Sequence, residues 1–272
     1  MRVWRSECGL MELREGSCFD VLRDARGVHA VISDPPYSVR QHGGYRSGTE
    51  MKEKMLERKR RRAGSTAKPI TGGAASIGVP YAPIDRAWCF NASALADRMG
   101  AGWLVAFGDH VSQRWWELGA EGTGWLTFAP LGWVKSDGGT PRFQGDGPGC
   151  GIEWITVARR RGHVYPGSLP PYYMHPQMQG NAHGKILKGQ KPLGLMRAIV
   201  RDYSEPGSTI VDFCAGSGTT LLAAAVEGRR AIGSEIDPKT FDKAVARLSK
   251  PYTRSDIFRP TAMDGSQATL GF

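Results

Sequence analysis

The chain has 272 residues, of which 40% are hydrophobic and 23% are charged, and its formal net charge at pH 7 is +10. This composition excludes a disordered chain, and no apolar run is long enough to span a bilayer. The positive charge favours a polyanionic partner, of which nucleic acid is the commonest in a cell.

The N-terminal residues and the cysteines indicate the cellular compartment of the protein. The first residues lack the apolar core of a signal peptide, which predicts a cytoplasmic protein without a membrane anchor. No pair of cysteines has zinc-ligand spacing, so we expect reduced thiols and no metal site. The five cysteines are Cys8, Cys18, Cys89, Cys150 and Cys214.

The first half of the chain mixes strands with a basic insertion. A short strand and turn are expected within residues 11–21, and a buried strand over 28–33 ends where prolines follow. Gly, Ser, Thr, Lys and Arg dominate from about 38 to 83, which indicates an inserted loop with a charged helix over 51–62. Further strands are expected at 103–107, 125–134 and 153–157.

The second half begins with another irregular basic segment, residues 159–188. The elements expected after it are a helix over 191–203, a strand over 209–213, a helix over 219–227 capped by Gly228, a strand over 230–234 and a last helix around 241–248. We therefore expect an α/β fold with a mostly parallel sheet and helices on both faces. Two antiparallel strands are expected at one edge, because 125–157 lacks a helical pattern.

Two glycines lie between the strand at 209–213 and the next helix. Such a turn can be ordinary, but glycine also lets the backbone pass close beneath a ligand. No lysine follows Gly218 as a P-loop requires, and Leu221 stands where a dinucleotide fingerprint has its third glycine. Glu235 ends the next strand, where a carboxylate can accept hydrogen bonds from ribose hydroxyls. S-adenosylmethionine fits this combination. The expected binding residues are Asp212, Phe213, Cys214, Ala215, Gly216, Ser217, Gly218, Thr219, Thr220 and Glu235.

Asp34-Pro35-Pro36-Tyr37 follows the buried strand at 28–33. The tetrapeptide is a good turn by itself, and Tyr37 can simply pack. It also suits chemistry on an exocyclic amine, whose lone pair is delocalised into the base. The Asp34 carboxylate and a backbone carbonyl held by the prolines would accept hydrogen bonds from that amine, and Tyr37 would stack on a flipped-out base. If the two motif-bearing strands are neighbours, methyl donor and target amine face each other across one crevice.

With both motifs present, the chain resembles the N4/N6 amino-methyltransferases of DNA in their circularly permuted β-class order, in which the catalytic motif precedes the cofactor loop. The likeness covers about residues 12–248 and includes Trp133-Val134-Lys135, Glu153, Lys191-Pro192 and the run from Gly228 to Ile236. It implies a Rossmann-like fold with a mixed seven-stranded sheet and one catalytic domain over 1–250, followed by a tail at 251–272.

The resemblance also implies roles. Lys191 and Pro192 would help hold the methionine part of the cofactor, and Glu235 would bind the ribose. Family members often have Gly-Asp near the N-terminus, where the Asp approaches the cofactor adenine. This chain has Gly16-Ser17 instead, and Ser17 can still accept or donate a hydrogen bond there.

The implied activity is N6 methylation of adenine in double-stranded DNA, in the cytoplasm of a prokaryotic or phage-infected cell. Residues 159–188 would form a short target-recognition segment, together with the basic insertion. Arg58–Arg62 and Arg159–Arg161 are candidate phosphate contacts. Base-reading candidates by residue type alone are Gln41, His42, Arg46, Tyr172, Tyr173, His175 and Gln177.

Two other readings stay open on sequence grounds. N4-cytosine methylation would use the same acceptors, although such enzymes more often begin the motif with Ser than with an aspartate such as Asp34. A catalytically silent nucleic-acid-binding subunit is the alternative from a different class. A homodimer is also left open.

Overall fold

The computed structural model describes residues 1–39, 82–139, 149–164, 167–177, 186–187 and 189–251. Most of the basic insertion, part of the expected target-recognition segment and the tail therefore lie outside the described residues, as do Gln41, His42, Arg46 and Arg58–Arg62. No helix within the described ranges is long and apolar enough to cross a membrane.

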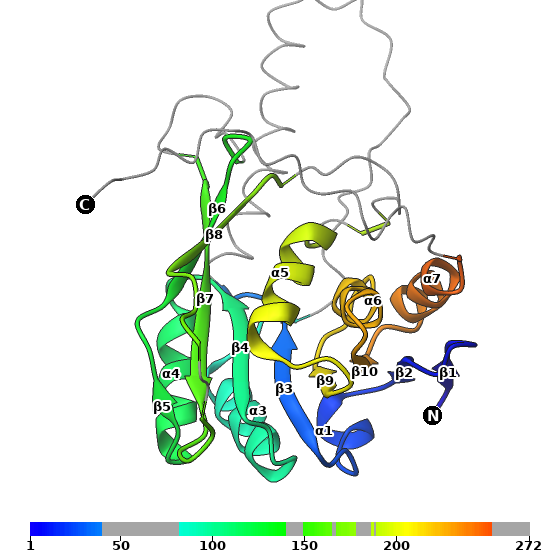
Figure 1. Cartoon of the computed structure of the whole chain (residues 1–272), viewed down its shortest axis with the longest axis horizontal. Coiled ribbons are helices and arrows are strands. Elements are labelled where there is room, and N and C mark those ends of the chain that lie inside the picture. The colour runs from blue at the N-terminus through cyan, green and yellow to red at the C-terminus, as the bar shows by residue number, and fades with distance from the viewer. Residues whose placement is uncertain (40–81, 140–148, 165–166, 178–185, 188, 252–272) are drawn as a thin grey trace, which may run out of the picture.

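One mixed sheet runs through the molecule in the order β1-β2-β10-β9-β3-β4-β7-β6-β8, with β5 paired to β7 (Figure 1). The parallel part consists of β2 (Met11–Glu15), β10 (Arg230–Glu235), β9 (Thr209–Asp212), β3 (Val28–Ser33) and β4 (Trp103–Gly108). Strand β1 (Val3–Arg5) pairs antiparallel to β2 at one edge. The predicted α/β fold with a mostly parallel sheet is confirmed.

The other edge is larger than the sequence predicted. Strand β7 (Ile152–Arg159) is antiparallel to β4, β5 (Leu126–Thr127) and β6 (Leu131–Lys135), and β8 (Tyr172–His175) is parallel to β6. The predicted antiparallel pair is present as β6 and β7, but the edge also contains β5 and β8, which were not predicted as separate strands. Within the part of the chain that the structure describes, the sheet has ten strands rather than the seven that the resemblance implied; β1, β5 and β8 are short additional strands.

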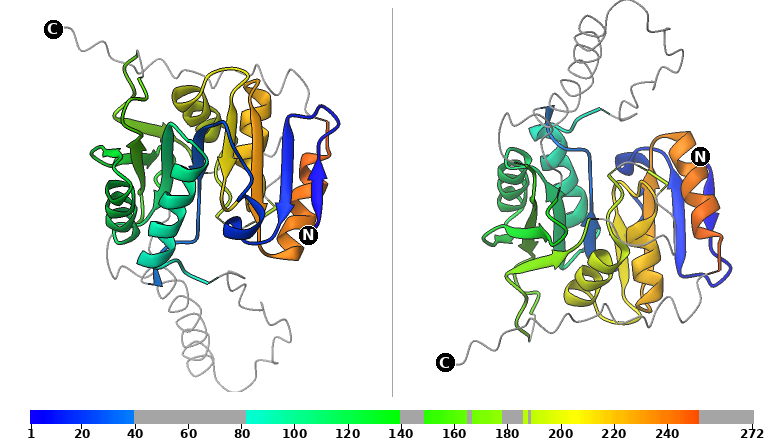
Figure 2. Two further views of the ribbon diagram at one scale, coloured as in Figure 1. Left: turned by 90° about the horizontal axis from the view of Figure 1, so that it is seen from below. Right: turned by 90° about the horizontal axis from the view of Figure 1, so that it is seen from above.

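Helices cover both faces of the sheet, as Figure 2 shows from two sides. On one face α5 (Leu193–Tyr203), α6 (Thr219–Val226) and α7 (Pro238–Leu248) pack on the strands, and their core includes Ile32 and Phe107. On the other face lie α1 (Cys18–Val21), α3 (Arg86–Arg98) and α4 (Ser112–Gly122), whose core includes Val31. Successive residues of β3 enter opposite cores, as alternation along a strand requires.

The topology reverses between β3 and β9. From β3 the chain moves to β4 on one side, and from β9 it moves to β10 on the other. In open α/β sheets, ligands bind beyond the carboxyl ends of the strands at this kind of reversal. The reversal thus lies between the two strands that carry the sequence motifs, where the topology rule expects a ligand to bind.

Candidate active site

The two motifs leave the same edge of the sheet from neighbouring strands. Strands β3 and β9 are parallel partners, with Val31 opposite Val211. Directly at their ends, Ser33 Oγ donates a hydrogen bond of 2.7 Å to Asp212 Oδ1, and both side chains are buried. The Asp34–Tyr37 turn, here called the catalytic turn after its expected role, and the glycine loop therefore begin side by side, although 179 residues separate Ser33 and Asp212 in the sequence.

Asp34 faces a buried cation. Lys191 Nζ lies 2.6 Å from Asp34 Oδ1, and the Lys191 side chain is 7% exposed. Burial raises the pKa of Asp34 to about 6, an effect that Lys191 opposes and that Glu153 and Asp212 reinforce. Near neutral pH the carboxylate is therefore mostly ionised and can accept hydrogen bonds. Its other oxygen, Oδ2, takes no part in this ion pair.

Hydrogen bonds fix the Tyr37 side chain and the backbone of the next residue, Ser38. Tyr37 Oη donates to Glu153 Oε2 at 2.6 Å and accepts from Lys191 Nζ at 3.2 Å. The next residue, Ser38, donates its backbone N–H to Asp109 Oδ2 at 3.1 Å, and its hydroxyl donates to the same oxygen. Asp109 also accepts from Ser112 N at 2.7 Å at the start of α4. The turn is thus tied to β7 and to the β4–α4 connection.

The glycine loop has the backbone geometry that its sequence predicts. Gly216 and Gly218 have φ angles of +53° and +76°, which side chains other than glycine rarely adopt. A Cβ on Gly218 would lie 2.7 Å from Leu248 Cδ1, so α7 packs tightly against the loop. From the same helix, Arg247 Nη1 donates to Ser217 O at 2.8 Å. A Cβ on Gly216, in contrast, would meet nothing closer than 3.9 Å.

Glu235 joins the loop to the end of β10. Its Oε2 accepts from Gly216 N at 2.9 Å and its Oε1 from Asp237 N at 2.8 Å. Burial raises the pKa of Glu235 to about 7, and these two N–H donors oppose the rise. A carboxylate has about four lone-pair sites, so two remain for the hydroxyls of a bound ribose. The residues present therefore fit an adenosine-containing cofactor.

Most of the other side chains of the loop are buried and stabilise its conformation. Phe213, Ala215, Ser217, Thr219 and Thr220 are buried. Burial raises the pKa of Asp212, while hydrogen bonds from Thr220 and Ser33 and the Cys214 N–H act in the opposite direction. Asp212 thereby links the start of the loop to β3.

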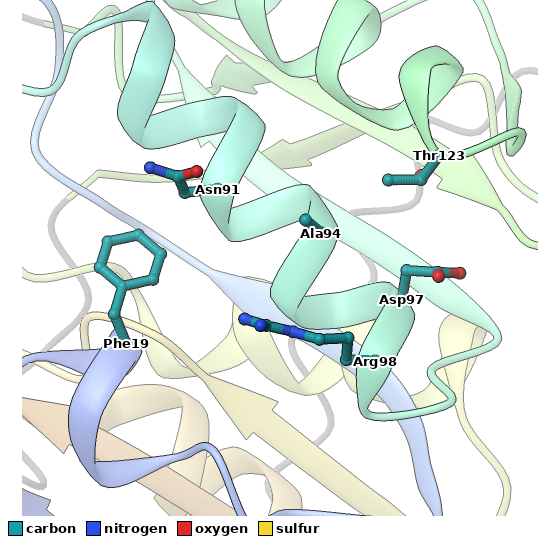
Figure 3. Close-up of a pocket in the computed structure, with 6 residues that line it drawn as sticks. All are labelled: Phe19, Asn91, Ala94, Asp97, Arg98 and Thr123. Carbon is teal, nitrogen blue, oxygen red and sulfur yellow. The ribbon is translucent and has the colours of Figure 1, made fainter.

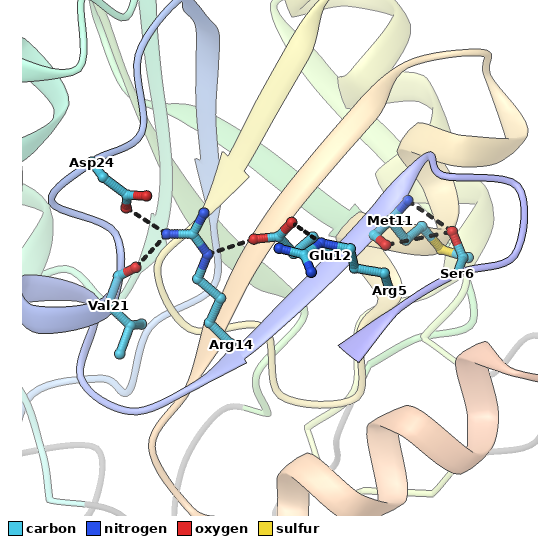
Figure 4. A network of polar contacts seen from close by, with 7 residues as sticks. All are labelled: Arg5, Ser6, Met11, Glu12, Arg14, Val21 and Asp24. Atoms are coloured by element: carbon cyan, nitrogen blue, oxygen red, sulfur yellow. Dashed lines mark hydrogen bonds and ion pairs between the residues drawn. The ribbon is translucent and has the colours of Figure 1, made fainter. Parts of the chain in front are cut away.

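Ser17 lies where the chain passes the end of β10. The N–H of Gly16 donates to Glu235 O at 2.9 Å, which places the Gly16–Ser17 turn beside the ribose-binding candidate. Figure 4 shows how β2 carries this turn: Arg14 donates to Val21 O and pairs with Glu12 and Asp24, so that α1 is tied back to the strand. The position suits the adenine contact that the resemblance predicts for Ser17.

Lys191 and Pro192 precede α5, and Pro192 is the N-cap residue. The resemblance assigned Lys191 to the methionine part of the cofactor. In the structure its ammonium group instead lies against the catalytic turn, 2.6 Å from Asp34 and 3.1 Å from Glu153. Lys191 thus belongs at least as much to the catalytic half of the site as to the cofactor half.

The structure does not bring Arg159–Arg161 to the site. Arg159 is opposite Trp103 at the start of β4, the end of the sheet away from the catalytic turn. Arg160 pairs with Asp97, and Arg161 Nε donates to Gly124 O. In the later part of the segment, Tyr172 is exposed on β8, whereas Tyr173 is buried and donates to Asp202. His175, at the end of β8, accepts from Trp133 Nε1 through its carbonyl.

A surface recess on the α1–α3 face also lies away from the two motifs. Figure 3 shows its lining, which contains no residue of the catalytic turn or the glycine loop. The lining residues are Phe19, Asn91, Ala94, Asp97, Arg98 and Thr123. Among the described residues no group of His, Cys, Asp or Glu could hold a metal ion.

Sequence reasoning missed three residues of the site. Asp109 was not singled out, and Lys135 and Glu153 were noted only as family matches without a role. A usable signal was present, because each is a charged residue at or beside a terminus of a largely apolar strand: Asp109 follows β4, Lys135 ends β6 and Glu153 is the second residue of β7. Charged residues are seldom buried unless they are paired, so a charged residue at such a position predicts an oppositely charged or hydrogen-bonding partner.

The arrangement defines a class of protein: a Rossmann-like α/β fold of the methyltransferase type, with an acidic proline turn beside a glycine loop. Comparisons with known proteins agree. Residues 159–246 match the model of the DNA methylase family. The DNA adenine methyltransferase YhdJ of Escherichia coli K12 is 29% identical over 132 residues, which is 44% of this chain and 44% of that protein. The chain thus aligns with less than half the length of this curated relative.

Two solved structures share the fold. M1.HpyAVI in complex with SAM has a TM-score of 0.57 and 18% sequence identity, over 88% of this chain and 100% of the other. The cytosine-N4-specific PvuII DNA methyltransferase has a TM-score of 0.62 and 12% identity, over 91% of this chain and 90% of the other. The predicted resemblance to the N4/N6 DNA methyltransferases is therefore confirmed.

Proposed function

We propose that this protein transfers a methyl group from S-adenosylmethionine to the N6 amino group of adenine in double-stranded DNA, acting on a base flipped out of the helix. The observation that carries the proposal is the junction of β3 and β9, where Ser33 donates to Asp212. It brings the ends of the two motif-bearing strands together, which supports one binding site shared by the acceptor turn and the cofactor-type loop. The family match and the adenine methyltransferase relative support the same activity.

The cofactor side would be formed by Glu235, the Gly216–Gly218 loop and Ser17. Glu235 would accept from the ribose hydroxyls, and Gly216, where an added Cβ would meet no atom closer than 3.9 Å, would let the ligand approach the backbone. When bound, the cofactor supplies an electrophilic methyl group on a sulfonium. The reaction forms an N–C bond and breaks the C–S bond, and one amino proton is released to water.

The catalytic side would be formed by Asp34, Pro35, Pro36 and Tyr37. Asp34 Oδ2 and a backbone carbonyl of the proline turn would accept the two amino hydrogens and so direct the nitrogen lone pair at the methyl group. Tyr37 would stack on the flipped base, with its ring held by the bond to Glu153. The contribution of these residues is orientation and electrostatics, and proton removal need not precede attack.

The decisive experiment incubates the full chain with double-stranded DNA and methyl-labelled cofactor, followed by mass spectrometry of the nucleosides. N6-methyladenine is the expected product. N4-methylcytosine would show that the same acceptors serve the other exocyclic amine and would overturn the adenine assignment. DNA binding and cofactor binding without a methylated product would identify a silent subunit instead.

A further inference from the structure

Four buried or partly buried charges form a chain behind the catalytic turn. Lys191 Nζ lies between Asp34 Oδ1, at 2.6 Å, and Glu153 Oε2, at 3.1 Å. The second oxygen of Glu153 lies 2.9 Å from Lys135 Nζ. We call these residues the charge quartet. Their signs alternate and sum to zero, which is the arrangement that makes a buried cluster of charges tolerable.

Glu153 has three polar partners in and beside the quartet. It pairs with both lysines, and it also accepts the 2.6 Å hydrogen bond from Tyr37 Oη. It therefore touches the stacking ring directly and reaches Asp34 through Lys191. The 15% exposure of its side chain leaves little access for water to replace these contacts.

The support beneath Glu153 is rigid. In β7 it lies opposite Trp133 of β6, and the next residue pairs with Gly108 of β4, so strands flank it on both sides. The lysine heads lie over aromatic rings: Lys191 Nζ is 4.9 Å from the centre of Phe107, and Lys135 Nζ is 5.3 Å from that of Trp133. These rings exclude water and strengthen the charge interactions.

We propose that Glu153 is a positioning residue for methyl transfer, which fixes Tyr37 and Lys191 together and so orients both the stacking ring and the cation that faces Asp34. The inference rests on the proposed function. It predicts that Glu153 mainly affects the rate of the chemical step, because its polar contacts are Tyr37, Lys135 and Lys191, of which only Lys191 was also expected to hold the cofactor. Cofactor affinity should then stay nearly constant when Glu153 is changed.

The charge of Glu153 should affect the pH dependence of the rate, which a purely structural role would not do. Burial alone would raise the pKa of Glu153, but Lys191, Lys135 and the Tyr37 hydrogen bond hold it at about 2, so Glu153 stays charged. The charged groups that act on Asp34 are Lys191 before α5, Glu153 on β7 and Asp212 on β9. Since Glu153 raises the pKa of Asp34, its neutralisation should lower that pKa and move the acid limb of the pH–rate profile to lower pH.

The test is Glu153→Gln, assayed for DNA methylation across the pH range with the full chain. We expect kcat to fall about ten- to a hundredfold, because misorientation of reacting groups has effects of this size. The Kd of the cofactor should remain unchanged and the acid limb should shift downward. Glu227→Gln is the matched control: Glu227 is 12% exposed and also pairs with two cations, Arg197 and Arg201, but on the α5–α6 face at the other end of the sheet.

A second variant guards against loss of the fold. Glu153→Gln leaves two buried ammonium groups with one carboxylate, whereas Glu153→Gln combined with Lys135→Met restores neutrality. Replacement of a buried ion pair by neutral groups is often harmless to stability. The double variant should therefore melt near the wild-type temperature and still turn over slowly, because Tyr37 has lost its charged acceptor.

The outcomes separate the two proposals. If the wild-type protein methylates DNA, three results would each overturn the positioning role alone. They are an unchanged kcat in Glu153→Gln, an acid limb of the pH–rate profile that does not move in Glu153→Gln, and full recovery of kcat in the double variant. Absence of methylation by the wild-type protein would overturn the proposed function, and the positioning role with it.

Discussion

The two halves of the site are built by different means. The cofactor half is centred on one local unit: a strand end, a glycine loop and a helix start within residues 209–226, held by backbone hydrogen bonds and close packing on Leu248, to which only Glu235 and Ser17 are added. The catalytic half is assembled from four distant segments and held by the charge quartet. Steric changes in the glycine loop should therefore impair cofactor binding, whereas charge changes in the quartet should impair the rate and its pH dependence.

The largest effect is expected from Asp34→Ala. Removal of one preorganised hydrogen-bonding group at a reacting centre costs about a hundred- to a thousandfold in kcat. Cofactor affinity should hold, because Asp34 lies in the catalytic half and Lys191 keeps its partner Glu153. Labelled-methyl transfer and calorimetric titration with the cofactor measure the two quantities.

A surface control belongs with that variant. Asp242→Ala removes an exposed aspartate on α7 that pairs with Arg2, and it should leave methylation unchanged. If Asp34→Ala methylated DNA at the wild-type rate, the acidic proline turn would not be the active site.

The glycine loop offers a steric test with an internal contrast. Gly216→Leu should lower cofactor affinity at least about tenfold, because its side chain would enter the region expected to hold the ligand, while the positive φ costs about 1–2 kcal/mol of stability. Gly218→Ala should behave in the opposite way, since its Cβ meets Leu248 at 2.7 Å and the fold itself must adjust. Melting temperature and cofactor Kd are measured on both variants. Gly216→Leu should have the weaker cofactor affinity, and Gly218→Ala should have the lower melting temperature.

The same contrast explains what the sequence could predict. Strands β3, β9 and β10 and helices α5 to α7 follow from apolar periodicity and from glycine caps such as Gly228, because those signals lie within each segment. The two motifs could be read for the same reason. Their adjacency was a conditional prediction from the α/β topology, and the β3–β9 pairing confirms it.

The catalytic half could not be read in this way. Asp34, Lys135, Glu153 and Lys191 meet only through the tertiary fold, so no spacing rule connects them. Helices α3 and α4 were also missed. Helix α4 contains Gly119, whose missing Cβ would lie 2.8 Å from Ser93 Oγ of α3, so the close packing of the two helices requires a residue that weakens the local helical pattern.

A moderate effect is expected from pH on the cofactor half. Burial raises the pKa of Glu235 to about 7, and Asp212 and Asp237 add to the rise. Ribose hydroxyls donate to the ionised carboxylate, so affinity should increase as the pH rises through 7 and weaken below it. A group with this pKa changes its ionised fraction about tenfold between pH 8 and pH 6, which sets the size of the change in Kd.

Glu235→Gln tests the origin of that dependence. The variant should bind the cofactor more weakly at pH 8 and lose the slope between pH 6 and pH 8. A slope that persisted in Glu235→Gln would assign the titration to another group of the crevice. Asp34, with a pKa of about 6, is distinguished because it affects turnover rather than cofactor Kd.

The smallest effect is expected at the end of the sheet away from both halves. Arg161 is exposed, and its Nε donates to Gly124 O beyond the start of β4, so Arg161→Ala should change DNA affinity by no more than about twofold. A lost phosphate contact would instead reduce the slope of log affinity against log salt by about one. Salt titrations of DNA binding by Arg161→Ala test this prediction. An unchanged slope agrees with DNA binding at the sheet edge where Ser33, Asp212 and Lys135 lie. A reduced slope would mean that DNA also contacts the opposite edge of the sheet.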